Sequence, residues 1–133
     1  MAADDVRRAR ILDTAEKLFS QYGVRRTSMD LLATEAGVAK PTLYAYFGSK
    51  EELFRSVVQA LIDAIINDAE SVAASSLPVD AKVRGILEAK FTRMYELVFS
   101  SAHAAELLES SDSQARDIAA EGGQHFRRIL TDV

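Results

Sequence analysis

The side chains between residues 40 and 50 include several that suit contact with nucleic acid. Lys40 and Lys50 offer positive charge to phosphate, and Thr42 offers a hydroxyl and a methyl group to base edges. Tyr44 and Tyr46 offer phenolic donors to phosphate oxygens. Each tyrosine also fits a half-buried core position, and Lys50 also fits an ordinary solvated surface. These side chains can read a duplex only if the backbone presents them together.

The residues before this stretch predict a short helix that ends in a sharp turn. Apolar residues recur at the spacing of one helix face, at Met29, Leu32, Ala33 and Ala36. Thr27 and Asp30 have the spacing of a capping box, so the helix is expected to start there. Gly37 follows directly, and a residue without a Cβ atom can take the left-handed conformation that ends a helix.

A second short helix is expected directly after the turn. Pro41 suits its first turn, where an N–H group would have no helical partner. Leu43 and Phe47 are four residues apart and should anchor this helix inward. The polar side chains named above then lie on its remaining surface. A helix, a glycine turn and a second helix of this kind are typical of a helix-turn-helix DNA reader.

A further capping box, Ser49 with Glu52, predicts that another helix begins just after Gly48. Lys50 would lie in the first turn of that helix. A cation is unfavourable beside a helix N-terminus unless an anion is bound there. Backbone N–H groups together with Lys50 would therefore form a clamp for a phosphate.

These residues closely resemble the N-terminal domain of the TetR family of bacterial transcriptional regulators. The resemblance covers roughly residues 7–60. It includes the pattern Thr27-Ser28-Met29, Leu32-Ala33, Ala36-Gly37-Val38, Pro41-Thr42-Leu43-Tyr44, Tyr46-Phe47, Ser49-Lys50-Glu51 and Leu53-Phe54. Upstream, Ile11, Leu12, Ala15, Leu18, Phe19 and Tyr22 form the apolar face of a helix ended by Gly23, as in the first helix of the family.

The resemblance implies a three-helix DNA-binding domain whose third helix, about residues 40–47, enters the major groove. Two residues at the start of the second helix would touch phosphate, Thr27 and Ser28. The recognition helix would contact DNA through Lys40, Pro41, Thr42, Tyr44 and Tyr46, and Lys50 would bind phosphate. Ala39 stands where the family often has a capping serine, so the recognition helix is expected to fray in the absence of DNA.

The composition and the residue spacing argue against several kinds of site and location. The chain has 133 residues and no cysteine, which removes disulfides and cysteine chemistry. No apolar stretch has the roughly 20 residues of a membrane span, and no signal peptide is recognisable, so we expect a cytoplasmic protein without a membrane partner. No nucleophile lies near a base and no histidine has a ligand at metal spacing, so we expect no enzyme activity, metal or cofactor.

The charge divides the chain into two parts. Residues 1–50 carry a formal charge of +2 and residues 51–133 carry −6, which together give the −4 of the whole chain. Such asymmetry suggests that the first part meets phosphate. We therefore expect an all-α protein with a helix-turn-helix DNA-binding domain over 1–50. A helical regulatory domain for ligand binding and dimerisation is expected over 51–133, and it looks incomplete because family members are longer.

The regulatory part is expected to contain long helices. Apolar stripes predict helices over about 51–74, from about 80 to the serines at 100–101, and from about 114 toward 133. Gly122 and Gly123 either weaken the last helix or let another helix approach closely. An effector pocket is a hypothesis for Phe91, Met94, Tyr95, Phe99 and His103, although such a stripe is more often plain core.

Two functional hypotheses follow. The first is a sequence-specific regulator of transcription, acting as a repressor. It would bind double-stranded DNA at a palindromic operator as a homodimer and be released by an unknown small-molecule effector. The alternative is a helical protein-interaction or ligand-binding module that retains a helix-turn-helix core. The salt dependence of binding distinguishes the two hypotheses, because binding to phosphate weakens steeply as the salt concentration rises.

Overall fold

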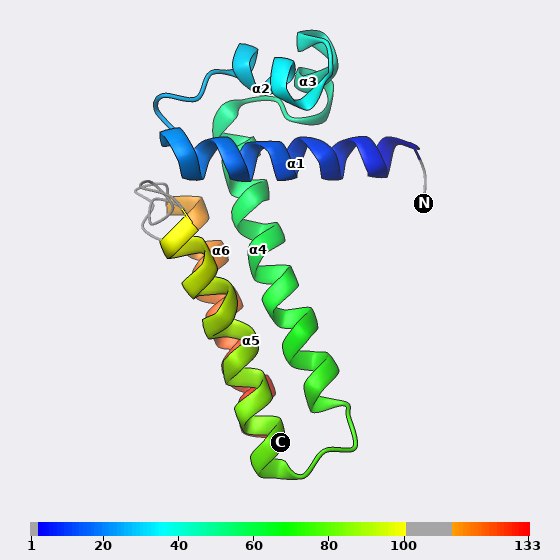
Figure 1. The fold of residues 1–133 in the computed structure, drawn as a ribbon, viewed down its shortest axis with the longest axis vertical. Helices are drawn as coiled ribbons and strands as arrows, with labels where there is room; N and C mark the ends of the chain where they lie inside the picture. The colour runs from blue at the N-terminus through cyan, green and yellow to red at the C-terminus, as the bar shows by residue number, and fades with distance from the viewer. Residues whose placement is uncertain (1–2, 101–112) are drawn as a thin grey trace.

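The computed structural model describes residues 3–100 and 113–133, without the side chains of 97–100. It is all-helical, and no strand occurs among the described residues. The helices are α1 (Ala3–Tyr22), α2 (Met29–Ala36), α3 (Lys40–Tyr46), α4 (Lys50–Ala73), α5 (Val79–Ser100) and α6 (Ser113–Asp132). Figure 1 shows α1 lying across the upper end of α4, with α2 and α3 above it. The all-α prediction is confirmed.

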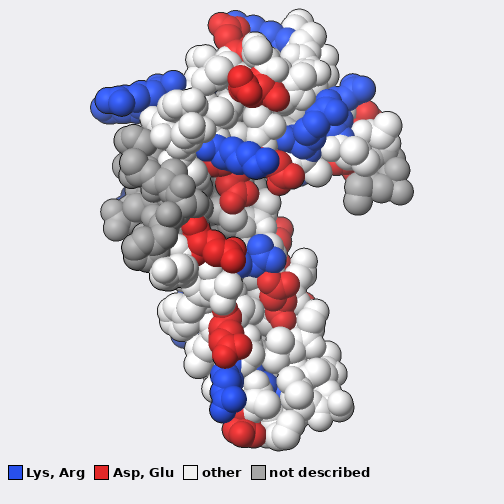
Figure 2. Space-filling model, in the orientation of Figure 1, with Lys and Arg blue, Asp and Glu red and all other residues white. Residues whose placement is uncertain are grey.

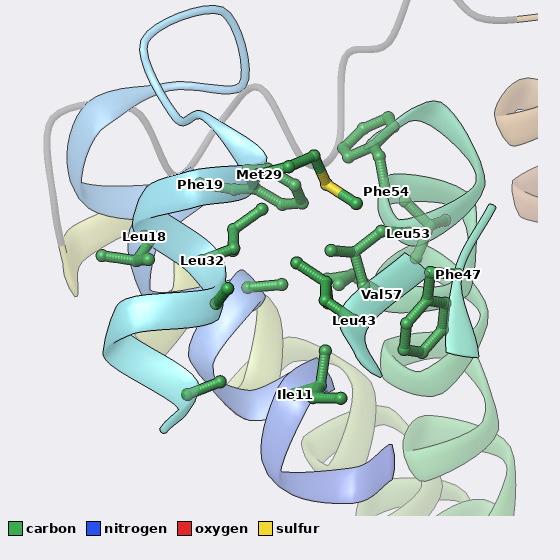
Figure 3. Packing of buried hydrophobic residues seen from close by; sticks show 14 of the residues in the cluster. Ile11, Leu18, Phe19, Met29, Leu32, Leu43, Phe47, Leu53, Phe54 and Val57 are labelled. Atoms are coloured by element: carbon green, nitrogen blue, oxygen red, sulfur yellow. The ribbon is translucent and has the colours of Figure 1, made fainter. Parts of the chain in front are cut away.

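We call α1, α2, α3 and residues 50–58 of α4 the head. Its core consists of apolar side chains from all four helices, as Figure 3 shows for Ile11, Leu32, Leu43 and Val57. The Phe19 and Phe54 rings meet edge to face, with centroids 5.9 Å apart. Because the first turns of α4 complete this core, the head extends past residue 50. The division of the chain at that residue stays a prediction.

Local sequence signals set the ends of the head helices. Gly37 ends α2 at a φ of 72°, in the left-handed region, as predicted. Ser49 caps α4, since its Oγ accepts from the N–H of Glu52 at 3.1 Å, and Glu52 Oε2 accepts from the N–H of Gly48 at 2.9 Å. The predicted cap of α2 was wrong by one residue. Ser28, and not Thr27, caps this helix by accepting from the N–H of Leu31 at 3.1 Å.

The rest of α4 packs with α5 and α6 into a second bundle, which we call the body. Its core contains Ile66, Ala69, Ile86 and Phe126. Gly122 of α6 lies so close to α4 that a Cβ atom there would be 2.5 Å from Cγ2 of Ile62. Of the two alternatives for the glycine pair, the close approach of another helix is observed at Gly122. None of the described helices is long and apolar enough to cross a membrane.

Candidate nucleic-acid interface

The α3 helix presents a polar surface because two large side chains anchor it from below. Leu43 is fully buried and Phe47 is 1% exposed. The guanidinium of Arg8 lies 5.1 Å from the centroid of the Phe47 ring, so α1 supports the same anchor by a cation–π contact. Tyr44 projects outward with 43% of its surface exposed, and Thr42 is partly exposed beside it. Pro41 lies in the first turn and is exposed.

Lys40 at the start of α3 has an acidic neighbour. Its Nζ lies 2.9 Å from Oδ1 of Asp30 on α2. The hydrogen bond to Asp30, followed by the charge of Asp30, raises the pKa of Lys40. Both side chains are more than half exposed, so the pair adds little stability and a DNA phosphate can compete for the ammonium.

Tyr46 and Lys50 also bond within the head. The Tyr46 hydroxyl donates to Oδ1 of Asp4 at 2.9 Å, which joins α3 to the first turn of α1. Partial burial, followed by this hydrogen bond, raises the pKa of the Tyr46 phenol. Lys50 Nζ donates to the carbonyl of Val24 at 2.8 Å, and an ammonium has two further protons to offer. Neither internal partner was foreseen from the sequence.

The two residues expected to touch phosphate before α2 have different environments. Ser28 is exposed, and its hydroxyl proton remains available while its oxygen caps the helix. Thr27 is fully buried, and its hydroxyl donates to the carbonyl of Gly23 at 2.8 Å. The Thr27 side chain therefore fixes the turn between α1 and α2 and does not face a duplex. This corrects the expectation carried over by resemblance.

Charge is distributed unevenly over the molecule. Figure 2 shows Lys and Arg side chains projecting from the head, with Asp and Glu side chains between them, and shows mainly Asp and Glu along the body on this face. Arg25 and Arg26 are exposed in the segment between α1 and α2. Exposed cations on the head favour phosphate contacts, which supply much of the affinity of DNA-binding proteins.

The body contains a cavity of about 200 Å³ between α4, α5 and α6. Of the side chains expected to line an effector pocket, Met94 does so. Phe91 and Tyr95 are 58% and 65% exposed on another face of α5, so their assignment to the pocket was wrong. The Phe99 side chain and His103 lie outside the described residues. The walls are mainly apolar: Val58, Leu61, Ile62, Ile65, Ile66, Met94, Ala119 and Phe126.

A helix-turn-helix head on a helical body is the architecture of a class of DNA-binding transcriptional regulators. Residues 11–57 match the family model described as bacterial regulatory proteins, tetR family. The transcriptional repressor SCO4008 of Streptomyces coelicolor is 30% identical over 142 aligned positions, covering 100% of this chain and 73% of SCO4008. The chain belongs to the tetR family of bacterial regulatory proteins.

A second curated relative agrees with this assignment, and a solved structure shares the fold. The transcriptional activator FasR of Mycolicibacterium smegmatis is 31% identical over 77% of this chain and 49% of FasR. The fatty acid degradation regulator FadR of Bacillus halodurans shares the fold, with a TM-score of 0.76 at 21% identity over 95% of this chain and 65% of FadR. The chain spans about half the length of three of the curated relatives it matches, at 48–49%.

Proposed function

We propose that this chain binds double-stranded DNA sequence-specifically and represses transcription as a homodimer on a palindromic operator. The observation that carries the proposal is the anchoring of α3. Leu43 and Phe47 are buried below it, while Tyr44, Thr42 and Lys40 stand on its outer surface. A short helix held in this way can enter the major groove with its side chains against base edges.

We also propose that a small molecule releases the repressor by binding in the body cavity. The support is the cavity itself, which has apolar walls and a few polar groups at its rim, as ligand sites commonly do. A bacterial regulator of this kind acts on the chromosome, so its proposed location is the cytoplasm.

Selection of bound duplexes from a random DNA pool at low salt tests the DNA-binding proposal. The wild-type chain should enrich an inverted repeat whose half-sites lie about 10 base pairs apart or at a multiple of that spacing. Tyr44→Ala should weaken the enrichment, while Arg84→Ala, which removes an exposed cation from the body, should not. A single enriched half-site would refute the dimeric arrangement, and no enrichment would refute sequence-specific binding.

Salt and variants separate base contacts from phosphate contacts. Thr42→Ala should relax specificity at one base position and cost about 1–3 kcal/mol of binding free energy. Lys50→Ala should weaken binding to all sequences and reduce the salt dependence. An affinity that does not change with salt concentration would instead favour the hypothesis of a protein-interaction module.

A further inference from the structure

Arg93 of α5 connects several parts of the molecule. It lines the body cavity, and its Nε donates to Oδ2 of Asp68 on α4 at 2.9 Å. The two side chains are 43% and 46% exposed, and an ion pair this exposed adds little stability because water competes for both partners. Arg93 can therefore exchange Asp68 for another anion at low cost.

The charge of Arg93 also lies near α1 of the head. Burial, followed by the charge of Asp13, raises the pKa of the Glu16 carboxyl in α1, and the positive charge of Arg93 partly offsets both effects. In Figure 1 the C-terminal part of α5 lies below the C-terminal half of α1. One guanidinium therefore lies within electrostatic reach of the cavity, of α4 and of α1.

The cavity combines apolar walls with two cations. Lys90 lies at its rim beside Arg93, with Nζ 4.9 Å from the centroid of the Phe126 ring. Val58 lines the cavity and is also part of the head core. Apolar walls with a cationic rim favour a ligand that has an apolar body and one anionic group.

The size of the cavity limits the apolar part of the ligand. About 200 Å³ holds roughly seven groups of the size of a water molecule, at about 30 Å³ each. An apolar chain of about seven carbon atoms would then fill the cavity, and a charged group on the next carbon, as in octanoate, would lie at its edge.

We propose that the cavity binds an apolar molecule carrying an anionic group, and that this group draws Arg93 away from Asp68. The proposal rests on the proposed function, because it names the chemistry of the effector and how it acts. The apolar body of the ligand fills the cavity, and Val58 transmits this filling into the core below α3. The ligand lowers the affinity for DNA as a result.

Calorimetric titration without DNA tests the ligand chemistry. Octanoate, octyl phosphate, octanol and octylamine share one chain length and differ in charge. Both anions should bind the wild-type chain at least about tenfold more tightly than octanol does. Arg93→Met should abolish this preference, whereas Arg84→Met, a matched change elsewhere on α5, should retain it. Equal binding of octanoate and octanol, no binding of any compound, or a preference retained in Arg93→Met would overturn the proposal.

DNA affinity measured with and without saturating octanoate tests the coupling. The wild-type affinity should fall by about 5- to 150-fold, the usual range of coupling between sites, and that of Arg93→Met should change little. An unchanged wild-type affinity would overturn the coupling. If the chain binds no DNA, the proposed function fails, while calorimetry still decides the ligand chemistry.

A second variant keeps the test decisive if Arg93→Met does not fold, which circular dichroism would reveal. Asp68→Asn removes the competing carboxylate and leaves Arg93 in place. Octanoate should then bind more tightly than to the wild type, and octanol should bind as before. Unchanged binding of octanoate to Asp68→Asn would contradict the proposed exchange of partners.

Discussion

The hydroxyl of Tyr46 on α3 donates to the carboxylate of Asp4 on α1, with 2.9 Å between the two oxygens. The two residues are 42 positions apart in the chain. Their bond holds the outer end of the proposed recognition helix against the first turn of α1. A Tyr46 hydroxyl that is engaged in this way is not free to donate to phosphate.

Removal of Asp4 should therefore strengthen DNA binding. Asp4→Ala frees the Tyr46 hydroxyl and removes a negative charge close to α3, so the affinity for any duplex should rise severalfold in fluorescence anisotropy. Asp5→Ala is the matched control, because it removes the same charge from the same helical turn. Equal effects of the two substitutions would show that the bond to Tyr46 is irrelevant to binding.

Thr27 should contribute to stability and not to DNA contact. Thr27→Val keeps the shape of the side chain but leaves the Gly23 carbonyl without its donor at 2.8 Å. The free energy of unfolding in urea should fall by about 1–3 kcal/mol, while Thr27→Ser, which retains the hydroxyl, should lose less. If Thr27→Val weakens DNA binding of the folded protein without a loss of stability, the assigned role is wrong.

Ala39 is a site where stability can be gained. It precedes α3 in an extended conformation, with φ −69° and ψ 148°, and makes no side-chain cap. Ala39→Ser should supply the missing acceptor and raise the free energy of unfolding by about 1 kcal/mol. Slower amide hydrogen exchange in α3 is the specific readout, because a general stabilisation would slow exchange in α6 equally.

Alanine substitutions at the two adjacent glycines of α6 should change the stability of the protein in opposite directions. At Gly122 an added Cβ would be 2.5 Å from Ile62, whereas at Gly123 the nearest atom is the flexible Arg127 Nη1 at 3.5 Å. Gly122→Ala should destabilise the protein by about 1–3 kcal/mol through overpacking. Gly123→Ala should stabilise it by up to about 1 kcal/mol through helix propensity.

Thermal unfolding compares these two variants directly. Ile62→Ala should cost less stability in the Gly122→Ala background than in the wild type, because it removes the Cγ2 methyl group that the added Cβ would meet at 2.5 Å. If both glycine-to-alanine substitutions stabilise the protein equally, α4 and α6 are not packed as closely as described.

The raised pKa of Glu16 predicts that the stability of the protein depends on pH. Its pKa is raised in the folded state, mainly by burial, so the folded protein binds a proton more readily than the unfolded chain. The ionised Glu16 carboxylate therefore lowers the free energy of unfolding near neutral pH. This destabilisation disappears as the pH falls through the raised pKa and the carboxyl takes up a proton. Glu16→Gln should stabilise the protein at about pH 7 and less so at about pH 5. An advantage that grows on acidification would contradict this sign.

The helices could be predicted from the sequence because apolar periodicity and caps are local signals. The long helix expected over about 51–74 is observed as Lys50–Ala73, and the last one, expected from about 114, begins at Ser113. Leu43 and Phe47 were correctly predicted to anchor α3, since their four-residue spacing places both on one face.

Other features could not be predicted because they depend on tertiary packing. Nothing in the sequence indicates that Asp4 and Tyr46 are in contact, because they are far apart in the chain. The buried face of α5 was also ambiguous, since apolar residues occur on more than one side of this helix. Packing against α4 and α6 decides that Met94 lines the cavity and that Phe91 and Tyr95 face outward.

The α4 helix connects the head rigidly to the body. It spans 24 residues without a glycine or a proline and is about 36 Å long. Leu53 belongs to the head core and Ala69 to the body core, so both cores move with one stiff rod. A tilt of about 5° about its midpoint displaces each end by about 1.5 Å. That displacement is about half the length of a hydrogen bond, so a small rotation of α4 beside the cavity is enough to disturb hydrogen bonds at the proposed DNA interface.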